Sequence, residues 1–188
     1  MTTDEAEAVV IGASAGALEA LSVILPSLQK GFRLPVMVVV HVPPDKRSVL
    51  VELFQAKCRL PVREAEDKEP ISGGTIYFAP ADYHLLVELD KSLSLSSDEP
   101  VLFSRPSIDV LFESAADAYG SALIAIVLTG ANQDGAKGMR AVVEAGGIAV
   151  VQSPDGAFAP AMPEAVIEMC PSARVISLNA IAAYLQEV

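Results

Sequence analysis

Short apolar runs, separated by stretches with helical spacing, recur along this chain of 188 residues. The runs at 7–12, 35–42, 122–130 and 148–152 are rich in Val, Ile and Ala, and polar residues do not alternate with them. Strands of this kind are buried on both faces, which is typical of a parallel sheet covered by helices. The pattern therefore predicts an α/β fold, doubly wound, with a mostly parallel central sheet and helices on both faces.

The segments between the runs have the apolar spacing of amphipathic helices. Ser107 and Ser177 precede two of these segments as N-cap residues, and Gly146 with Gly147 is typical of a helix end. We therefore expect a short strand at 174–177 and helices over 16–29, 45–57, 107–120, 134–147, 161–169 and from Leu178 onward.

The region 60–97 has a different character, because short strand-like pieces are separated there by Gly, Pro and Asp. Several of these pieces alternate polar with apolar residues, as strands do when one face of the sheet is exposed to solvent. We expect a small antiparallel patch around 60–97. No repeat or linker interrupts the chain, so we expect a single domain over 1–188.

The composition excludes several classes of protein. The chain carries 24 Asp and Glu against 13 Lys and Arg, which argues against nucleic acid or an anionic membrane as partner. Its two cysteines lack CxxC spacing and are expected to be free thiols in a reducing compartment. No signal peptide begins the sequence, and no apolar stretch reaches the ~18 residues of a membrane span. We expect a cytoplasmic protein.

The turn after the first apolar run, GASAGA at 12–17, fits two templates. As a dinucleotide-binding turn (G-x-G-x-x-G) it fits poorly, because Ser14 stands where the second glycine approaches a pyrophosphate. Every position fits a nucleophile elbow (G-x-S-x-G), which displays a serine between a strand and a helix. A third interpretation is purely structural, with Ser14 capping the following helix. The turn alone does not decide between the last two.

A serine nucleophile needs a base and an orienting carboxylate, and the sequence offers candidates for both. His41 ends the second apolar run, and Asp134 follows the run at 122–130. Because neighbouring parallel strands end at one edge of a sheet, Ser14, His41 and Asp134 are expected to lie together there. The structural alternatives are a histidine that only packs and an aspartate that only caps a helix. His84 begins a strand-like piece, and we expect it to be structural.

Six blocks of the sequence resemble, in order, the catalytic domain of the chemotaxis protein-glutamate methylesterase (CheB) family. They lie between Val9 and Ile167 and are IGASAGALEAL, VVVHVPP, IYFAPADYHLLVE, SRPSIDVLFESAA, VLTGANQDGAKGM and SPDGAFAPAMPEAVI. The resemblance implies a doubly wound α/β domain. It also implies Ser14 as nucleophile, His41 as base and Asp134 as orienting carboxylate.

The reaction that the resemblance implies is hydrolysis of glutamate γ-methyl esters on the cytoplasmic region of chemoreceptors, with deamidation of receptor glutamines as a second activity. Backbone amides at Ala15 and Ala131 would bind the oxyanion, and no metal or cofactor is required. Arg105, in the SRPSID block, would hold an acidic receptor segment or stabilise its own loop. A chemosensory methyltransferase is a further expected partner.

The chain also departs from the family's usual pattern. Many members have Thr where Ala15 stands and Met-Gly where Ala131 and Asn132 stand. Members usually carry a preceding receiver domain, and we expect none in this chain. These departures leave open a catalytically idle module that docks on receptors or on a methyltransferase. A nucleotide-binding protein is a weaker third hypothesis.

Overall fold

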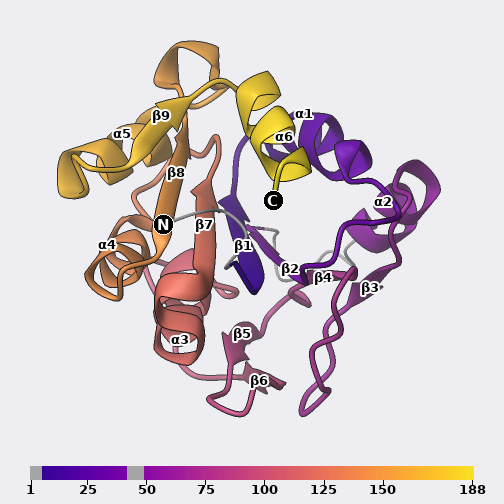
Figure 1. The fold of residues 1–188 in the computed structure, drawn as a ribbon. Helices are drawn as coiled ribbons and strands as arrows, with labels where there is room; N and C mark the ends of the chain where they lie inside the picture. Colours follow the sequence, from indigo (N-terminus) through magenta and orange to yellow (C-terminus); the bar gives the residue numbers. More distant parts are fainter. Residues whose placement is uncertain (1–5, 42–48) are drawn as a thin grey trace.

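The computed structural model describes residues 6–41 and 49–188, and these form a seven-stranded, fully parallel sheet (Figure 1). The strand order is β3-β4-β2-β1-β7-β8-β9. The strands are β1 (Ala8–Ala13), β2 (Val36–Val40), β3 (Val62–Glu64), β4 (Ile76–Phe78), β7 (Leu123–Val127), β8 (Ile148–Gln152) and β9 (Arg174–Ile176).

Strand β1 lies at the centre of the sheet, between β2 and β7. From β1 the chain passes to β2, then to β3 at the edge of the sheet and back to β4 between them. It then returns to β7 beside β1 and runs outward on the other side through β8 to β9. The strand order therefore reverses at β1. In open α/β sheets, ligands bind outside the carboxyl ends of the strands at such a switch point. The turn 12–17 occupies this place.

Within the described ranges, three helices cover each face of the sheet, as the apolar strands predict. Alternate residues of each strand point to opposite faces, so Val10 packs on one side and Val9 and Ile11 on the other. One layer contains α1 (Ala17–Ile24), α2 (Leu50–Lys57) and α6 (Leu178–Gln186), and the other contains α3 (Ile108–Tyr119), α4 (Ala136–Glu144) and α5 (Ala161–Met169). Short 3₁₀ turns follow α1, α3 and β8 at Leu25–Ser27, Gly120–Ala122 and Pro154–Gly156.

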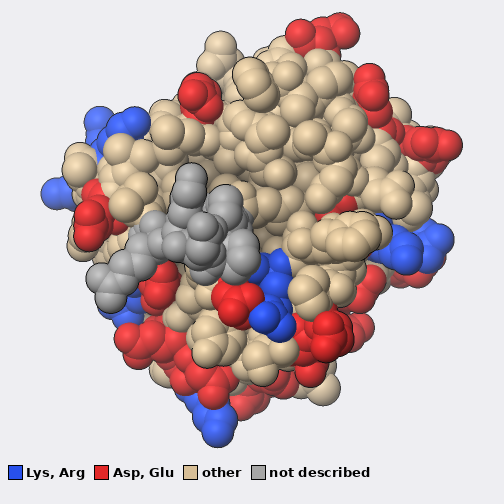
Figure 2. All heavy atoms as spheres, turned by 180° about the vertical axis from the view of Figure 1, so that it is seen from behind, with Lys and Arg blue, Asp and Glu red and all other residues tan. Residues whose placement is uncertain are grey.

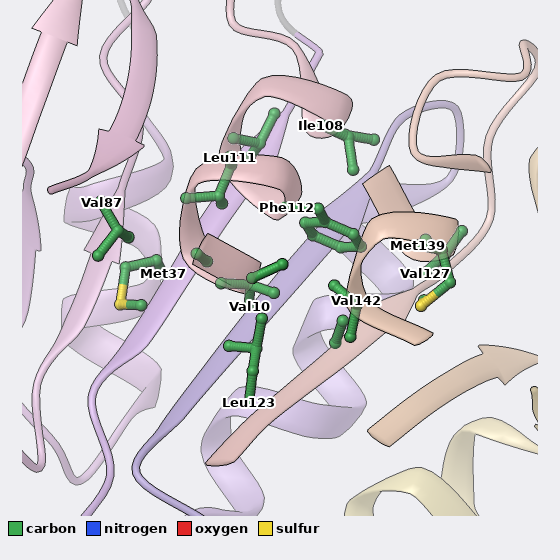
Figure 3. Close-up of a cluster of buried hydrophobic side chains, with 14 of the residues drawn as sticks. Val10, Met37, Val87, Ile108, Leu111, Phe112, Leu123, Val127, Met139 and Val142 are labelled. Atoms are coloured by element: carbon green, nitrogen blue, oxygen red, sulfur yellow. The ribbon is translucent and has the colours of Figure 1, made fainter. Parts of the chain in front are cut away.

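Helices α3 and α4 pack against the sheet over a continuous apolar core (Figure 3). Phe112 of α3 and Met139 of α4 are fully buried, as are Val10 and Val127 of the strands below them. Burying each such side chain contributes about 1.5–3 kcal/mol. The amino ends of α3 and α4 are thereby held on a rigid base.

The antiparallel part of the structure is narrower than the 60–97 region expected to contain it. It consists of β5 (His84–Val87) and β6 (Leu93–Ser96), which pair as a hairpin. Strands β3 and β4 instead extend the parallel sheet. Strand β3 lies at the edge of this sheet, with Val62 buried and Arg63 and Glu64 exposed, so its partly polar sequence does not mark a separate sheet.

The other elements agree with the predicted ones to within a few residues at their ends. Two predicted features lie partly outside the described residues. They are the end of the second apolar run, at 42–44, and the start of the helix expected over 45–57, at 45–48.

In the described part of the chain, no helix is both long and apolar enough to cross a membrane. Figure 2 shows one face, with acidic side chains gathered over its lower half and a broad uncharged area above.

The close approach of β1 to α3 generates a prediction about stability. A Cβ atom at Gly12 would lie 2.4 Å from Cγ2 of Ile108, the first residue of α3. Gly12→Ala should therefore lower the free energy of unfolding by about 1–3 kcal/mol, because the buried Ile108 side chain must shift within a packed core. Urea unfolding measures this. Gly31→Ala is the control, since a Cβ atom at that position would meet no neighbour within 4 Å. Equal stability of the two variants would contradict the packing described.

Candidate active site

Ser14 follows the central strand directly, in a turn that leads into α1. Its amide donates to the Thr129 carbonyl at 2.9 Å, and its carbonyl accepts from the Ala17 amide at 2.9 Å. The side chain is half-buried, and its hydroxyl makes no hydrogen bond to any residue in 6–41 or 49–188. It therefore does not cap α1. The turn displays an unengaged hydroxyl at the switch point of the sheet.

The turn requires glycine at position 16. Gly16 has a φ of 83°, in the left-handed region that disfavours a side chain. A Cβ atom there would also lie 2.6 Å from the Cβ of Phe158. Both constraints act where the chain turns from strand to helix, which is the geometry of a nucleophile elbow.

His41 lies beside Ser14 because β2 pairs with β1. The His41 amide donates to the Ala13 carbonyl at 3.2 Å, which continues the ladder one residue beyond β2. Its ring Nε2 lies 2.7 Å from Oδ2 of Asp134, and the side chain is 12% exposed. With Nε2 bound to the carboxylate, Nδ1 is the ring nitrogen left to exchange a proton.

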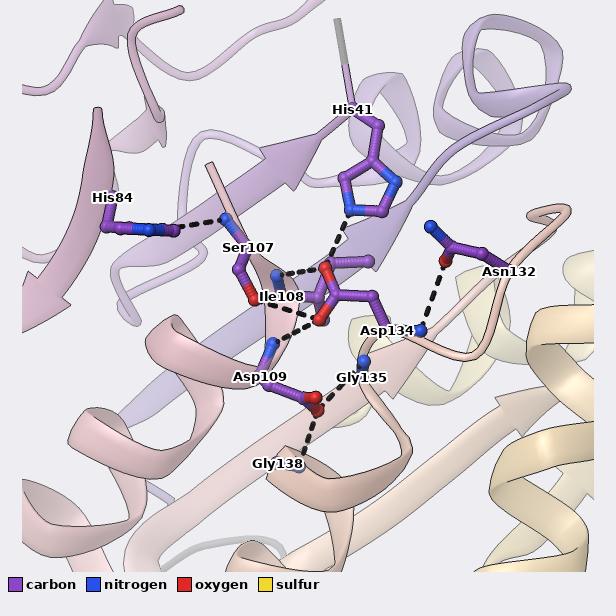
Figure 4. Close-up of polar contacts among 9 residues, drawn as sticks. All are labelled: His41, His84, Ser107, Ile108, Asp109, Asn132, Asp134, Gly135 and Gly138. Carbon is purple, nitrogen blue, oxygen red and sulfur yellow. Dashed lines mark hydrogen bonds and ion pairs between the residues drawn. The ribbon is translucent and has the colours of Figure 1, made fainter. Parts of the chain in front are cut away.

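Asp134 is fully buried and accepts four hydrogen bonds (Figure 4). Oδ2 accepts from His41 and from the Ile108 amide, both at 2.7 Å, and Oδ1 accepts from the Ser107 hydroxyl and the Asp109 amide, both at 2.9 Å. Burial by itself would raise the pKa of Asp134, but the hydrogen bonds from His41 and the α3 amides bring it below its usual value. The group is a carboxylate beside the imidazole.

The first turn of α3 is capped differently from the expectation. Ser107 occupies the N-cap position, but its hydroxyl donates to Asp134 instead of accepting from its own helix. Asp134 accepts amides in the first turn of α3, where the serine was expected to act, because a carboxylate stabilises a helix N-terminus more strongly than a hydroxyl.

His84 makes hydrogen bonds that tie neighbouring segments together, in line with the structural role expected for it. Its Nδ1 accepts from the Ser107 amide at 3.1 Å, and its Nε2 donates to the Glu99 carbonyl at 3.0 Å.

Asp109 is a buried acidic residue that the sequence did not single out. Its Oδ1 accepts from the amides of Gly135 at 2.9 Å and Gly138 at 2.7 Å, at the start of α4. Burial raises the pKa of Asp109 to about 6, against the lowering effect of the Gly138 amide, and the neighbouring Asp134 adds to the rise. The block SRPSID contained the signal, since it carries both Ser107 and Asp109.

Ala15 and Ala131, the predicted oxyanion donors, have amides with no acceptor among the described residues. The preceding carbonyls are both engaged: Ser14 accepts from Ala17, and Gly130 accepts from Met162 at 2.9 Å. A trans peptide holds its C=O and N–H on opposite sides, so each bound carbonyl fixes the direction of the following amide. The two amides, one within the Ser14 turn and one in the loop after β7, are therefore held in fixed directions with no acceptor among the described residues.

Arg105 is held by its own loop and by Asp82, which precedes β5. Its Nε and Nη2 donate to Oδ1 of Asp82 at 3.0 and 2.7 Å, and its Nη1 donates to the carbonyls of Ser97 and Asp98 at 2.9 and 3.0 Å. These contacts support the loop-stabilising alternative. Contact of Arg105 with a substrate stays a prediction.

A cleft of about 530 Å³ borders the predicted oxyanion donor Ala131. Its other walls are the loop at Leu102 and Phe103, Asn132 and the α5 side chains Glu164 and Glu168. Phe103 is fully exposed at the tip of its loop. Within the described ranges, no group of three or more His, Cys, Asp and Glu side chains is arranged to hold a metal ion.

The arrangement brings together the functional groups that acyl transfer requires. A hydroxyl, an imidazole paired with a buried carboxylate, and two directed amides gather at the carboxyl ends of β1, β2 and β7. Such a set can attack a carbonyl carbon, accept the nucleophile's proton and stabilise the resulting oxyanion.

Comparisons with known proteins show which family the chain resembles. A protein of Leptospira interrogans, provisionally named a protein-glutamate methylesterase/protein-glutamine glutaminase, is 46% identical over 94% of this chain and 91% of its own length. A Rhodospirillum rubrum protein-glutamate methylesterase/protein-glutamine glutaminase is 37% identical, and the match covers 94% of this chain and 47% of that protein.

The fold also matches a solved structure, the Thermotoga maritima CheB methylesterase catalytic domain. That structure superposes with a TM-score of 0.92 over 97% of this chain and 98% of the other, at 34% identity. The family model described as CheB methylesterase matches residues 9–185. This chain therefore belongs to the CheB methylesterase family.

Proposed function

We propose that this chain is a serine esterase that hydrolyses glutamate γ-methyl esters on chemoreceptors, releasing glutamate and methanol. The observation that carries the proposal is the 2.7 Å contact between His41 and the buried Asp134, at the strand end next to Ser14. The names of the relatives support the substrate class. In this proposal Ser14 is the nucleophile, His41 the base and Asp134 the orienting carboxylate.

The first half of the reaction forms an acyl-enzyme. Ser14 Oγ attacks the ester carbonyl carbon while His41 Nδ1 takes the hydroxyl proton, and the carbonyl oxygen becomes an oxyanion that the amides of Ala15 and Ala131 bind. The tetrahedral intermediate then collapses. The bond from carbon to the methoxy oxygen breaks, and the imidazolium returns the proton, so that methanol leaves.

The second half regenerates the enzyme. His41 removes a proton from a water molecule, whose oxygen attacks the Ser14 acyl carbon, and the proton passes to Ser14 Oγ as the acyl bond breaks. The product is the glutamate carboxylate. A glutamine side chain would follow the same path with ammonia as the leaving group, which accounts for a second, deamidating activity.

Asp134 supports both halves without itself exchanging a proton. Its pKa lies below the usual value, so it stays ionised wherever the imidazole acts as base. The carboxylate holds the proton on Nε2, which leaves the lone pair on Nδ1, and it stabilises the imidazolium that forms.

The partner in this proposal is the cytoplasmic region of a methyl-accepting chemoreceptor, which places the reaction in the cytoplasm. A chemosensory methyltransferase, which would supply the ester, is the second partner. We expect the receptor segment that carries the ester to lie along the cleft beside Ala131, whose walls include one predicted oxyanion donor. Arg105 would contribute by holding its loop at the rim.

Ser14→Ala should abolish methanol release from methylated chemoreceptor membranes without unfolding the protein. The hydroxyl makes no hydrogen bond to a described residue, so its removal costs the folded state little. Methanol release by purified wild type and variant measures the loss, and thermal unfolding checks the fold. Ser72→Ala, at an exposed position before β4, is the matched control. Full activity of Ser14→Ala would refute the proposal, whereas receptor binding without turnover by wild type would favour a docking module.

Asp134→Asn should lower kcat by about 10⁴-fold, the effect of this change in a Ser-His-Asp enzyme. An amide facing Nε2 favours the tautomer with its proton on Nδ1, which cannot accept the serine proton. Stopped assays of methanol release measure kcat. The control is Asp117→Asn on the exposed side of α3, which should keep wild-type activity. A loss of less than tenfold in folded Asp134→Asn would exclude the assigned role.

A further inference from the structure

Asp109 contacts the Asp134 segment in two ways. Its main-chain amide donates to Oδ1 of Asp134, and its side-chain Oδ1 accepts from the amide of Gly135, the next residue along the chain (Figure 4). The first bond holds the carboxylate, and the second holds the backbone from which that carboxylate projects. A single residue of α3 therefore restrains both ends of the Asp134 side chain.

The contacts are reciprocal between two helices. Asp134, just before α4, accepts the first amides of α3, and Asp109, in the first turn of α3, accepts amides at the start of α4. Each negative charge sits at the N-terminus of the other helix, where the helix dipole stabilises it. Gly135, the N-cap of α4, has no side chain to do this itself.

Capping alone does not require a charge at position 109. An uncharged Asn could accept the same amides, whereas a carboxylate here is buried beside a second carboxylate. The groups that face Asp109 are Asp134, Glu113 on its own helix, and Lys137 and Glu168 across a cavity of about 320 Å³. Because burying the charge is costly, we take the function of the side chain to lie in the oxygen that accepts the two α4 amides, and not in the charge itself.

We infer that Asp109 is a positioning residue for the esterase reaction: through Gly135 and its own amide, it holds Asp134 where that carboxylate reaches His41. The inference rests on the proposed function, since the aligned group serves the proposed base. It assigns Asp109 no contact with the substrate. The residue acts on the reaction only through the place and orientation of Asp134.

Two variants separate positioning from simple packing. Asp109→Ala removes both bonds to α4, so kcat for methanol release should fall by about 10–100-fold while KM stays within about twofold. Asp109→Asn keeps an oxygen at the Oδ1 position, where both amide bonds end, so it should restore most of kcat. Asp117→Asn controls for loss of a negative charge from α3.

A second measurement does not depend on the reaction. The ring proton on Nε2 of His41 gives a low-field ¹H NMR signal while it is bonded to Asp134, and this signal should weaken or shift in Asp109→Ala and persist in Asp109→Asn. If wild type hydrolyses no ester, the proposed function fails, and the NMR comparison still tests whether Asp109 positions Asp134.

The inference is overturned if folded Asp109→Ala keeps kcat within about threefold of wild type, or if its His41 signal is unchanged. It is also overturned if folded Asp109→Asn is as impaired as Asp109→Ala. If thermal unfolding shows that Asp109→Ala does not fold, the test relies on Asp109→Asn alone. Near-normal kcat with an intact His41 signal then supports the inference, and a large loss of either overturns it.

Discussion

The hydrogen bonds that converge on the Asp134 carboxylate join parts of the molecule that are distant in sequence. They connect His41 at the end of β2, the first turn of α3 and the loop before α4. A buried carboxylate is tolerated only when donors replace the water it has lost, and here four donors do so. The same bonds that stabilise the charge therefore fix the imidazole next to the serine turn.

The predicted oxyanion donors of the site are main-chain groups, at Ala15 and Ala131. The amides of Ala15 and Ala131 are directed by carbonyls that are bound to Ala17 and Met162. Alanine at these two positions still supplies a main-chain N–H, which is the only group the proposed role needs. The departures at Ala15 and Ala131 thus remove side-chain atoms but no main-chain donor, which weakens the alternative of an idle module on physical grounds.

Much of this arrangement follows from the sequence, because burial on both faces leaves a clear pattern. Uninterrupted apolar runs predicted the parallel strands, and parallel strands bring Ser14 and His41 to one edge of the sheet. The cross-capping of α3 and α4 did not follow, because Ser107 and Asp109 have the local pattern of any helix start. Local propensity does not record that a residue's partner lies on another element.

The orientation of the imidazole shows what such a site requires. In the chymotrypsin arrangement Nδ1 binds the carboxylate and Nε2 faces the serine, whereas here Nε2 binds Asp134. The chemistry needs one nitrogen to keep its proton on a carboxylate while the other carries a lone pair, and either nitrogen satisfies that need. Which one does so is decided by geometry, since Asp134 is held by α3 and His41 by β2. The same acid–base chemistry can therefore be assembled on this sheet with the ring reversed.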